Sequence, residues 1–464
     1  MPEQNSTLSI ADTIHRPFFL AAIITVLTLG CVWGAFNLLT IGLRQSFGAT
    51  DYSWILAHGH AMVVGFVGFF IMGVAYRVFP RFKHTSLWRP RIAFSVLPAM
   101  VIGILVQTVA HLTAPDGPYI ELAIFAGALQ IGAIFIFALV IIRTIQAGKR
   151  EPFDRFIYAA LGWFLLAAIA NPVIFTLFEA PGSRENLLFY LATFNIPYRD
   201  VQLLGVAVIM ILGVSLRLLP GAYGLRKPSP QWEAFMFWGV NSAILVGVVT
   251  YIVGMSQGNH WLLTIHWAAS LVILFVAVSL PSQYRLFSPF PEAGRDRSLK
   301  FIRAAYVWFI VAAVMLVAVP LYNFGIYPAL TGSRTPFSHA FFGAYRHALT
   351  VGFIMMMIIG VSSRVVPTFS GIDVQRTNSL WLTFILLNLG NALRVTTEVA
   401  TDFTPKAYSI MGVSGFIEVV ALGLWAFQIV KDMQFGRRFQ PVAPANTIHQ
   451  TTRNHITKGH ALQA

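Results

Sequence analysis

The feature that most constrains this chain is a series of long apolar stretches, each about 20 residues, separated by short polar loops. Twelve stretches are centred near residues 30, 67, 103, 133, 167, 209, 243, 271, 313, 354, 389 and 419. Of the 464 residues, 56% are hydrophobic and only 11% are charged, against roughly 25% charged residues in soluble domains. Because every backbone polar group in lipid needs an internal hydrogen bond, we expect an all-α integral membrane protein with twelve transmembrane helices.

The distribution of Lys and Arg predicts the orientation in the membrane. These residues concentrate in the loops after the even-numbered stretches, and such loops stay in the cytoplasm. We therefore expect a multi-pass protein of the cell's inner membrane with both termini cytoplasmic: a polar segment, 1–16, without a signal-peptide cleavage site, and a basic, disordered tail, 436–464. The net charge of +14 then needs no nucleic acid, and the expected partner is the lipid bilayer.

Three of the stretches share one ungapped pattern, G-x7-G-V-x2-R-x2-P. They read "HAMVVGFVGFFIMGVAYRVFP" (60–80), "DVQLLGVAVIMILGVSLRLLP" (200–220) and "HALTVGFIMMMIIGVSSRVVP" (347–367). Each copy lies on the second of four successive stretches. The pattern predicts one membrane domain, 17–435, built from three four-helix repeats around a pseudo-threefold axis, at about 17–150, 151–298 and 299–435.

An ionisable residue stands five positions before the first glycine of each copy: His60, Asp200 or His347. Such residues are costly inside a membrane unless they have a partner, so they are candidates for function. If the repeats surround one axis, His60 and His347 come to equivalent heights and could hold a haem iron from opposite sides. His58 lies roughly 200° around the helix from His60 and should address a neighbouring site, whereas His339 shares the face of His347.

An arginine, Arg394, falls in the middle of the eleventh stretch. Its charge needs an anion nearby, and the candidates are haem propionates, Asp200 or Glu398. Gln107 occupies the corresponding place in the first repeat. Both repeats therefore place a polar side chain at this depth.

Several short motifs resemble those of the NnrS family, haem- and copper-containing membrane proteins linked to the nitric oxide response. They are "HRPFF" (15–19), "AHGHAMVVGF" (57–66), "HALTVG" (347–352) and "NALRVTTE" (391–398). Ala61 stands where the family motif has glutamate. The arrangement of spans is also distantly similar to subunit I of the haem-copper oxidases.

The resemblance implies haem as the cofactor, with copper as a second candidate. Metal ligands would come from His58, His60, His339 and His347, with Arg394 and Asp200 beside the cofactor. The implied function is a response to nitric oxide or nitrosative stress, or redox chemistry of a small oxidant, with a small gaseous ligand and an electron donor as partners. No residue is assigned a catalytic role, because the pattern fits binding and turnover alike.

Two other functions stay open at this point. An electron-transfer subunit like those of cytochrome oxidases or nitric oxide reductases would share the topology, although the sixth and seventh stretches lack the histidines of a copper-binding triad. A secondary transporter would also have twelve spans, but the best-known carriers divide into six plus six rather than into three fours.

Overall fold

The computed structural model describes residues 9–289, 297–333 and 337–435, and these residues form helices with no strand among them. The predicted tail, 436–464, lies outside the described residues, as does 1–8 of the N-terminal segment. A short helix, α1 (Ile10–Thr13), opens the described chain.

The long helices follow the order of the predicted spans, and several of them contain a stretch of π-helix (η). The first third comprises α2 (His15–Thr25), η1 (Val26–Gly30) and α3 (Cys31–Arg44), then α4 (Tyr52–His60), η3 (Ala61–Val67) and α5 (Gly68–Phe82), then α6 (Pro90–Thr113) and α7 (Tyr119–Gln146). The second third comprises α8 (Asp154–Glu179), then α9 (Arg184–Asp200), η4 (Val201–Val208) and α10 (Ile209–Tyr223), then α11 (Pro230–Gln257) and α12 (His260–Tyr284). The last third comprises α13 (Leu299–Leu321), η6 (Tyr322–Ile326) and α14 (Tyr327–Thr331), then α15 (His339–His347), η7 (Ala348–Met355) and α16 (Met356–Phe369), then α17 (Trp381–Ala400) and α18 (Lys406–Phe435).

Eleven helical segments of the described residues are long and apolar enough to cross a membrane, by length and composition. The chain is therefore a multi-pass membrane protein. The predicted span near residue 389 is also a long helix, α17, but it falls outside these eleven. It carries four strongly polar side chains: Asn388, Asn391, Arg394 and Glu398.

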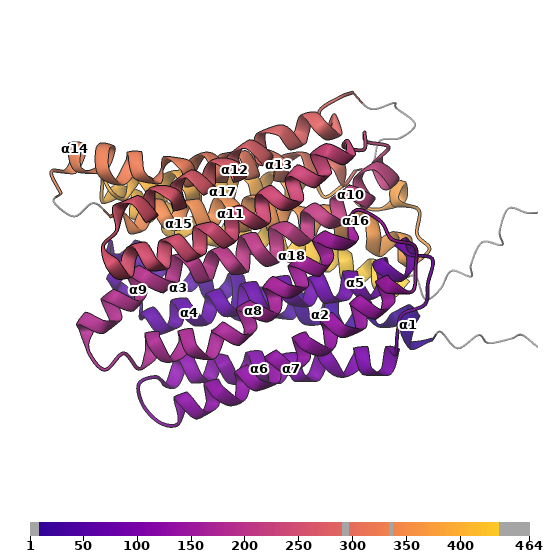
Figure 1. Cartoon of the computed structure of the whole chain (residues 1–464), viewed down its shortest axis with the longest axis horizontal. Coiled ribbons are helices and arrows are strands. Elements are labelled where there is room, and N and C mark those ends of the chain that lie inside the picture. The colour runs from indigo at the N-terminus through magenta and orange to yellow at the C-terminus, as the bar shows by residue number, and fades with distance from the viewer. Residues whose placement is uncertain (1–8, 290–296, 334–336, 436–464) are drawn as a thin grey trace, which may run out of the picture.

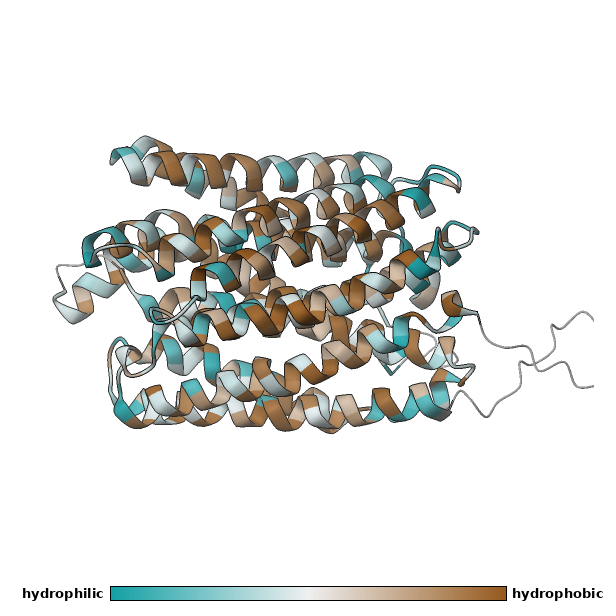
Figure 2. Ribbon diagram, turned by 90° about the horizontal axis from the view of Figure 1, so that it is seen from below, coloured by the Kyte–Doolittle hydropathy of each residue, from teal (hydrophilic) through white to brown (hydrophobic). Residues whose placement is uncertain are grey.

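The helices run side by side along the long axis of the molecule (Figure 1). Apolar residues fill the middle of the bundle, and hydrophilic residues gather at its two ends (Figure 2). The last helix, α18, packs against both α17 and α3, so the end of the chain returns to its beginning. This contact closes the bundle.

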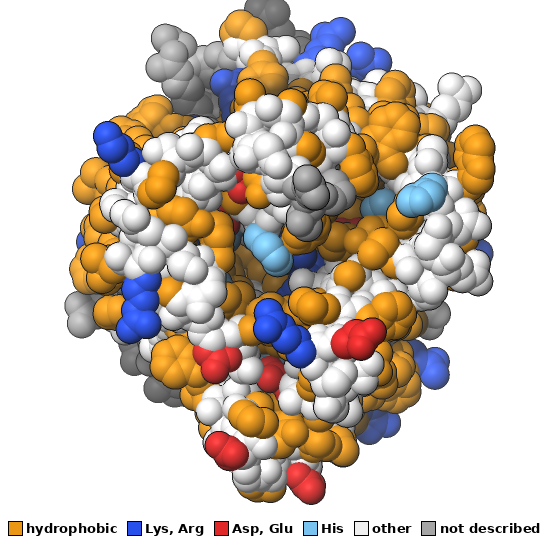
Figure 3. Space-filling view, turned by 90° about the vertical axis from the view of Figure 1, so that its left-hand side faces the viewer, with side chains coloured by type: hydrophobic (Ala, Val, Ile, Leu, Met, Phe, Trp, Pro, Cys, Tyr) orange, Lys and Arg blue, Asp and Glu red, His pale blue; other side chains and the backbone are white. Residues whose placement is uncertain are grey.

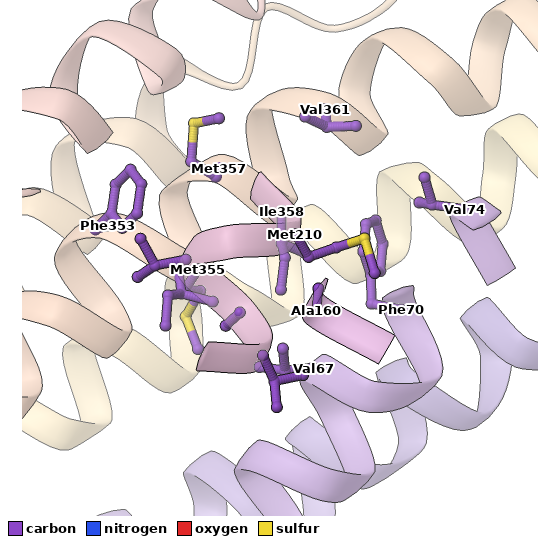
Figure 4. Close-up of a cluster of buried hydrophobic side chains, with 14 of the residues drawn as sticks. Val67, Phe70, Val74, Ala160, Met210, Phe353, Met355, Met357, Ile358 and Val361 are labelled. Atoms are coloured by element: carbon purple, nitrogen blue, oxygen red, sulfur yellow. The ribbon is translucent and has the colours of Figure 1, made fainter. Parts of the chain in front are cut away.

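The three helices that carry the repeated pattern form its centre. In their most apolar stretches 78–83% of the residues are buried, against 22–50% in the other eight candidate spans. The π segment η4 contacts both η3 and η7. Side chains from all three helices, including Val67, Met210 and Phe353, meet in one buried cluster (Figure 4).

The second glycine of the pattern makes the same contact in each third of the chain. A Cβ atom placed on it would lie within 3.2 Å of a phenylalanine Cβ on the preceding long helix. The pairs are Gly73 with Phe18, Gly213 with Phe156, and Gly360 with Phe301. Glycine at this position therefore lets the two helices approach closely.

Candidate functional site

We call the end of the bundle opposite α1, where α4, α9 and α15 begin, the far end (Figure 1). Its surface is hollowed (Figure 3). Histidine, acidic and basic side chains are visible in and around it (Figure 3). Each central helix changes from α to π geometry directly after its ionisable residue. The π segments start at Ala61, Val201 and Ala348, one residue after His60, Asp200 and His347. π-helical turns occur frequently at functional sites.

His58 is held against the first long helix. Its Nδ1 atom lies 3.0 Å from the carbonyl oxygen of Gly30, the last residue of η1. A Cβ atom at Gly34 would lie 2.5 Å from Cε1 of His58, so only glycine leaves room for the ring. Because a carbonyl oxygen can only accept, Nδ1 carries the proton and Nε2 keeps a free lone pair.

His347 has the same arrangement on α15. Its Nδ1 atom lies 3.0 Å from the carbonyl oxygen of Gly343 and 3.7 Å from Oε2 of Glu398. In the described part of the chain, no protein group hydrogen-bonds to Nε2 of either His58 or His347. The charge of His58 is among those that act on His347. Two histidines, from the first and last thirds of the chain, thus each keep Nε2 as the available ligand atom.

Arg394 is buried on α17 and donates a hydrogen bond of 3.0 Å from Nη2 to Oε1 of Glu398, one turn further along. Of the three anions expected for this arginine, the structure shows Glu398. The Nε and Nη1 atoms of Arg394 are buried without a partner, and so is Oε2 of Glu398. Since Glu398 also faces His347, this ion pair lies beside the histidine pair.

A further acidic residue, Glu418 on α18, belongs to the same buried cluster. Its Cγ atom lies 2.8 Å from where a Cβ of Gly390 would be, and its charge interacts with that of Arg394. The cluster therefore holds one arginine and two carboxyl groups. The sequence analysis missed Glu418, although a carboxyl group in the middle of an apolar stretch was the signal that could have found it.

His60 faces a different part of the interior. Its side chain is buried and lies against Gln130 of α7, with Nε2 unpartnered. The charge interactions of His60 are with His111 and Arg199, whereas those of His347 include His58. The two histidines of "HGH" thus have different surroundings, and His58 is the one with a hydrogen bond to a backbone carbonyl.

Two other predicted site residues, Asp200 and His339, have different partners. Asp200 is half-buried, and its charge interacts with that of Arg346. His339 is exposed at the start of α15, with its ring centroid 4.7 Å from that of Phe337. Across 9–289, 297–333 and 337–435, no three His, Cys, Asp or Glu side chains come together in a way that could hold a metal ion.

Comparisons with known proteins agree with this architecture. A search of curated proteins gave no match. Among solved structures, the chain is similar to one titled "Cryo-EM structure of a heme-copper terminal oxidase dimer provides insights into its catalytic mechanism", with a TM-score of 0.61 and 12% sequence identity over 94% of this chain and 86% of that chain. At this identity the likeness concerns the fold. The family model described as "NnrS protein" matches residues 10–434, and the chain therefore belongs to the NnrS family.

Proposed function

We propose that this chain is a haem-binding membrane protein in which His58 and His347 would hold the haem iron. The observation that carries this proposal is the shared state of the two imidazoles, each with Nδ1 held at 3.0 Å by a backbone carbonyl and Nε2 free. Ligating histidines characteristically donate their other ring N–H to such an acceptor, which fixes the tautomer and the ring orientation. We propose this pair in place of the combination of His60 with His347.

Two further features support haem. Gly34 leaves room for the His58 ring, and two donor nitrogens of Arg394 have no hydrogen-bond partner and could donate to a propionate. Haem held by two histidines would supply one-electron redox chemistry and, after loss of one ligand, a binding place for a small gas. Copper, the second cofactor that the family resemblance implies, would be bound by the same two histidines.

The proposed role is that of an NnrS protein in the response to nitric oxide or nitrosative stress, or in redox chemistry of a small oxidant, served by an electron donor. The proposed architecture is twelve spans in three four-helix units around a pseudo-threefold axis, with the far end outside and both termini in the cytoplasm of an inner-membrane protein. The threefold recurrence of the π segments and of the glycine–phenylalanine contacts supports it. The fold likeness favours an oxidase-like electron-transfer subunit as the second candidate.

Absorption spectra of the full-length protein, purified from haem-replete cells, test the proposal. We expect a Soret band that is lost or strongly shifted in His58→Ala and in His347→Ala. His266→Ala is the matched control, because its Nδ1 atom is also held by a backbone carbonyl, that of Gly247, at 2.9 Å. Retention of the band in His60→Ala is expected. A colourless wild-type protein would refute haem binding and favour a secondary transporter. Loss of the band in His60→Ala but not in His58→Ala would favour His60 and His347 as the ligands.

A further inference from the structure

We propose that Arg199 and Arg346, on two of the three central helices, together bind one monovalent carboxylate at the far end. The two arginines occupy equivalent places in the second and third copies of the repeated pattern, each one residue before the ionisable position held by Asp200 or His347. In the first copy this place is taken by Gly59. Two central helices therefore bring a guanidinium to the start of their π segments, and the third leaves space there.

The Arg199 guanidinium reaches from its own helix to the first central helix. A Cβ atom placed on Gly59 would lie 3.0 Å from Nη2 and 3.5 Å from Cζ of Arg199, so the guanidinium lies against the bare backbone of α4. Its Nη1 atom donates to Oε1 of Gln202 at 2.8 Å, which helps to hold it there. The Nε and Nη2 atoms make no hydrogen bond within the described residues, yet they remain accessible to solvent, unlike the unpartnered nitrogens of Arg394.

Arg346 has no protein partner at all in the described part of the chain, since its guanidinium makes neither a hydrogen bond nor an ion pair there. Its charge is among those that act on Arg199 and on Asp200. The charges of both arginines also act on Tyr52, the first residue of α4. Two like charges in shared, partly buried surroundings repel each other, and an anion between them would relieve this repulsion.

Contacts at the opposite ends of the central helices show the direction in which these helices reach one another. Arg217 of the second copy lies with Cζ 6.0 Å from the ring centroid of Phe82 on α5. Arg364 of the third copy lies with Cζ 5.1 Å from the ring centroid of Tyr223 on α10. Each copy thus reaches back to the copy before it. The same relation at the far end directs Arg346 towards α9, in agreement with the action of its charge there.

The acidic side chains of this region do not neutralise both arginines. Three carboxylates already have partners: Glu179 with His111 and Ser53, Glu398 with Arg394, and Asp402 with Tyr322 and Ser338. Asp200 remains, and it forms no ion pair within the described residues. Two positive charges and one negative charge leave a net charge of +1, so the place suits one monovalent anion.

The chemistry of the guanidinium group favours a carboxylate. Its planar fork of N–H donors matches the two oxygens of a carboxylate and can bond to both at once. The hollow opens the far end to solvent, so a free carboxylate could enter from there (Figure 3). A haem propionate has the same chemistry, and the experiment below separates the two sources.

Equilibrium dialysis of the full-length holoprotein against radioactive formate, the smallest carboxylate, in a chloride buffer tests the inference. We expect one saturable formate per wild-type chain. Arg199→Gln and Arg346→Gln should each weaken binding by at least about tenfold, because each removes charge-assisted hydrogen bonds. Arg184→Gln is the matched control: it makes the same change on the same helix, but Arg184 is exposed at the start of α9, and it should bind formate like the wild type.

The outcome can be separated from folding and from haem. Each variant should keep the wild-type elution volume and unfolding temperature; if a glutamine variant does not, lysine replaces the same arginine and should also bind more weakly, because it lacks the fork. The Soret band should not change when formate is added, which excludes binding to the iron. Wild-type protein from haem-depleted cells should bind formate equally, so this inference and the haem proposal can fail independently.

Four results would overturn the inference. They are no saturable formate binding to the wild type, unchanged binding in both arginine variants, an equal loss in Arg184→Gln, and binding to the haem-free protein alone. The last result would assign the two arginines to a haem propionate instead of a free carboxylate.

Discussion

Replacing Glu398 by glutamine should destabilise the folded protein more than replacing Arg394 by glutamine. Both side chains are buried, with 3% and 9% of their surface exposed, and their charged atoms are 3.0 Å apart. Glu398→Gln leaves a guanidinium that cannot lose its charge, and an uncompensated buried charge costs about 3–5 kcal/mol. Arg394→Gln leaves a carboxylate that can take up a proton, and the cost should be about 1–3 kcal/mol.

A neighbouring carboxyl group affects how large the cost of Glu398→Gln should be within the range of about 3–5 kcal/mol. Glu418 interacts with the charge of Arg394 and remains in Glu398→Gln, so we expect the lower end, about 3 kcal/mol. The double variant Arg394→Gln/Glu398→Gln removes both charges. Its cost should fall short of the sum of the single variants by about 0.5–3 kcal/mol, as for other directly contacting pairs.

The measurement is the free energy of unfolding from titration with sodium dodecyl sulfate in mixed micelles, followed by tryptophan fluorescence. Thr396→Val is the control on the same helix, since Thr396 is exposed and its hydroxyl bonds only within the helix; a change below about 0.5 kcal/mol is expected. The reasoning is refuted if Arg394→Gln proves the more damaging change, or if the two single effects add without coupling.

Three further predictions concern other contacts of the structure. Gly34→Ala should displace the His58 ring and lower the haem content severalfold, measured as the ratio of Soret to protein absorbance, because the added Cβ would meet Cε1 at 2.5 Å. Asp154→Asn should lower the free energy of unfolding by about 3–5 kcal/mol, because it leaves the fully buried ammonium group of Lys83, now 2.8 Å from the carboxylate, without an anion. Arg394→Gln should shift the haem reduction potential downward in a redox titration, since removing a nearby positive charge disfavours the electron-rich state.

Each of these three has a control that separates its cause from general damage. Gly162→Ala should leave haem content unchanged, because a Cβ there would meet nothing within 4 Å. The double variant Lys83→Met/Asp154→Leu should be milder than Asp154→Asn, since it removes both charges. Arg394→Lys should keep the haem reduction potential close to the wild-type value, since it keeps the positive charge. The opposite order in any pair would contradict the corresponding prediction.

The helices could be predicted because lipid leaves the backbone few alternatives, and a run of about 20 apolar residues is sufficient to locate each one. The repeated glycines could also be found in the sequence, since their spacing is the same in all three copies. α17 is the exception, since it falls outside the eleven helices that are apolar enough to cross a membrane. Arg394 and Glu398, which belong to the candidate site, are among the residues that make this helix polar. The sequence analysis still found it, as the apolar stretch centred near residue 389.

The proposed use of His58 rather than His60 could not be predicted from the sequence. It depends on how closely the first long helix approaches, which places the Gly30 carbonyl within hydrogen-bonding distance of His58.

The π segments of the three central helices have an evolutionary consequence. Each separates a far-end half, which carries the ionisable residue, from a half anchored by the glycine–phenylalanine contact. Deleting one residue within a π segment would restore α-helical geometry and leave the two halves near their present relative orientation, because a π turn accommodates one residue more than an α turn. A lineage could thus gain or lose a single codon here without changing which side chain faces the hollow, and the number of residues between the histidine and the first glycine would record each such event.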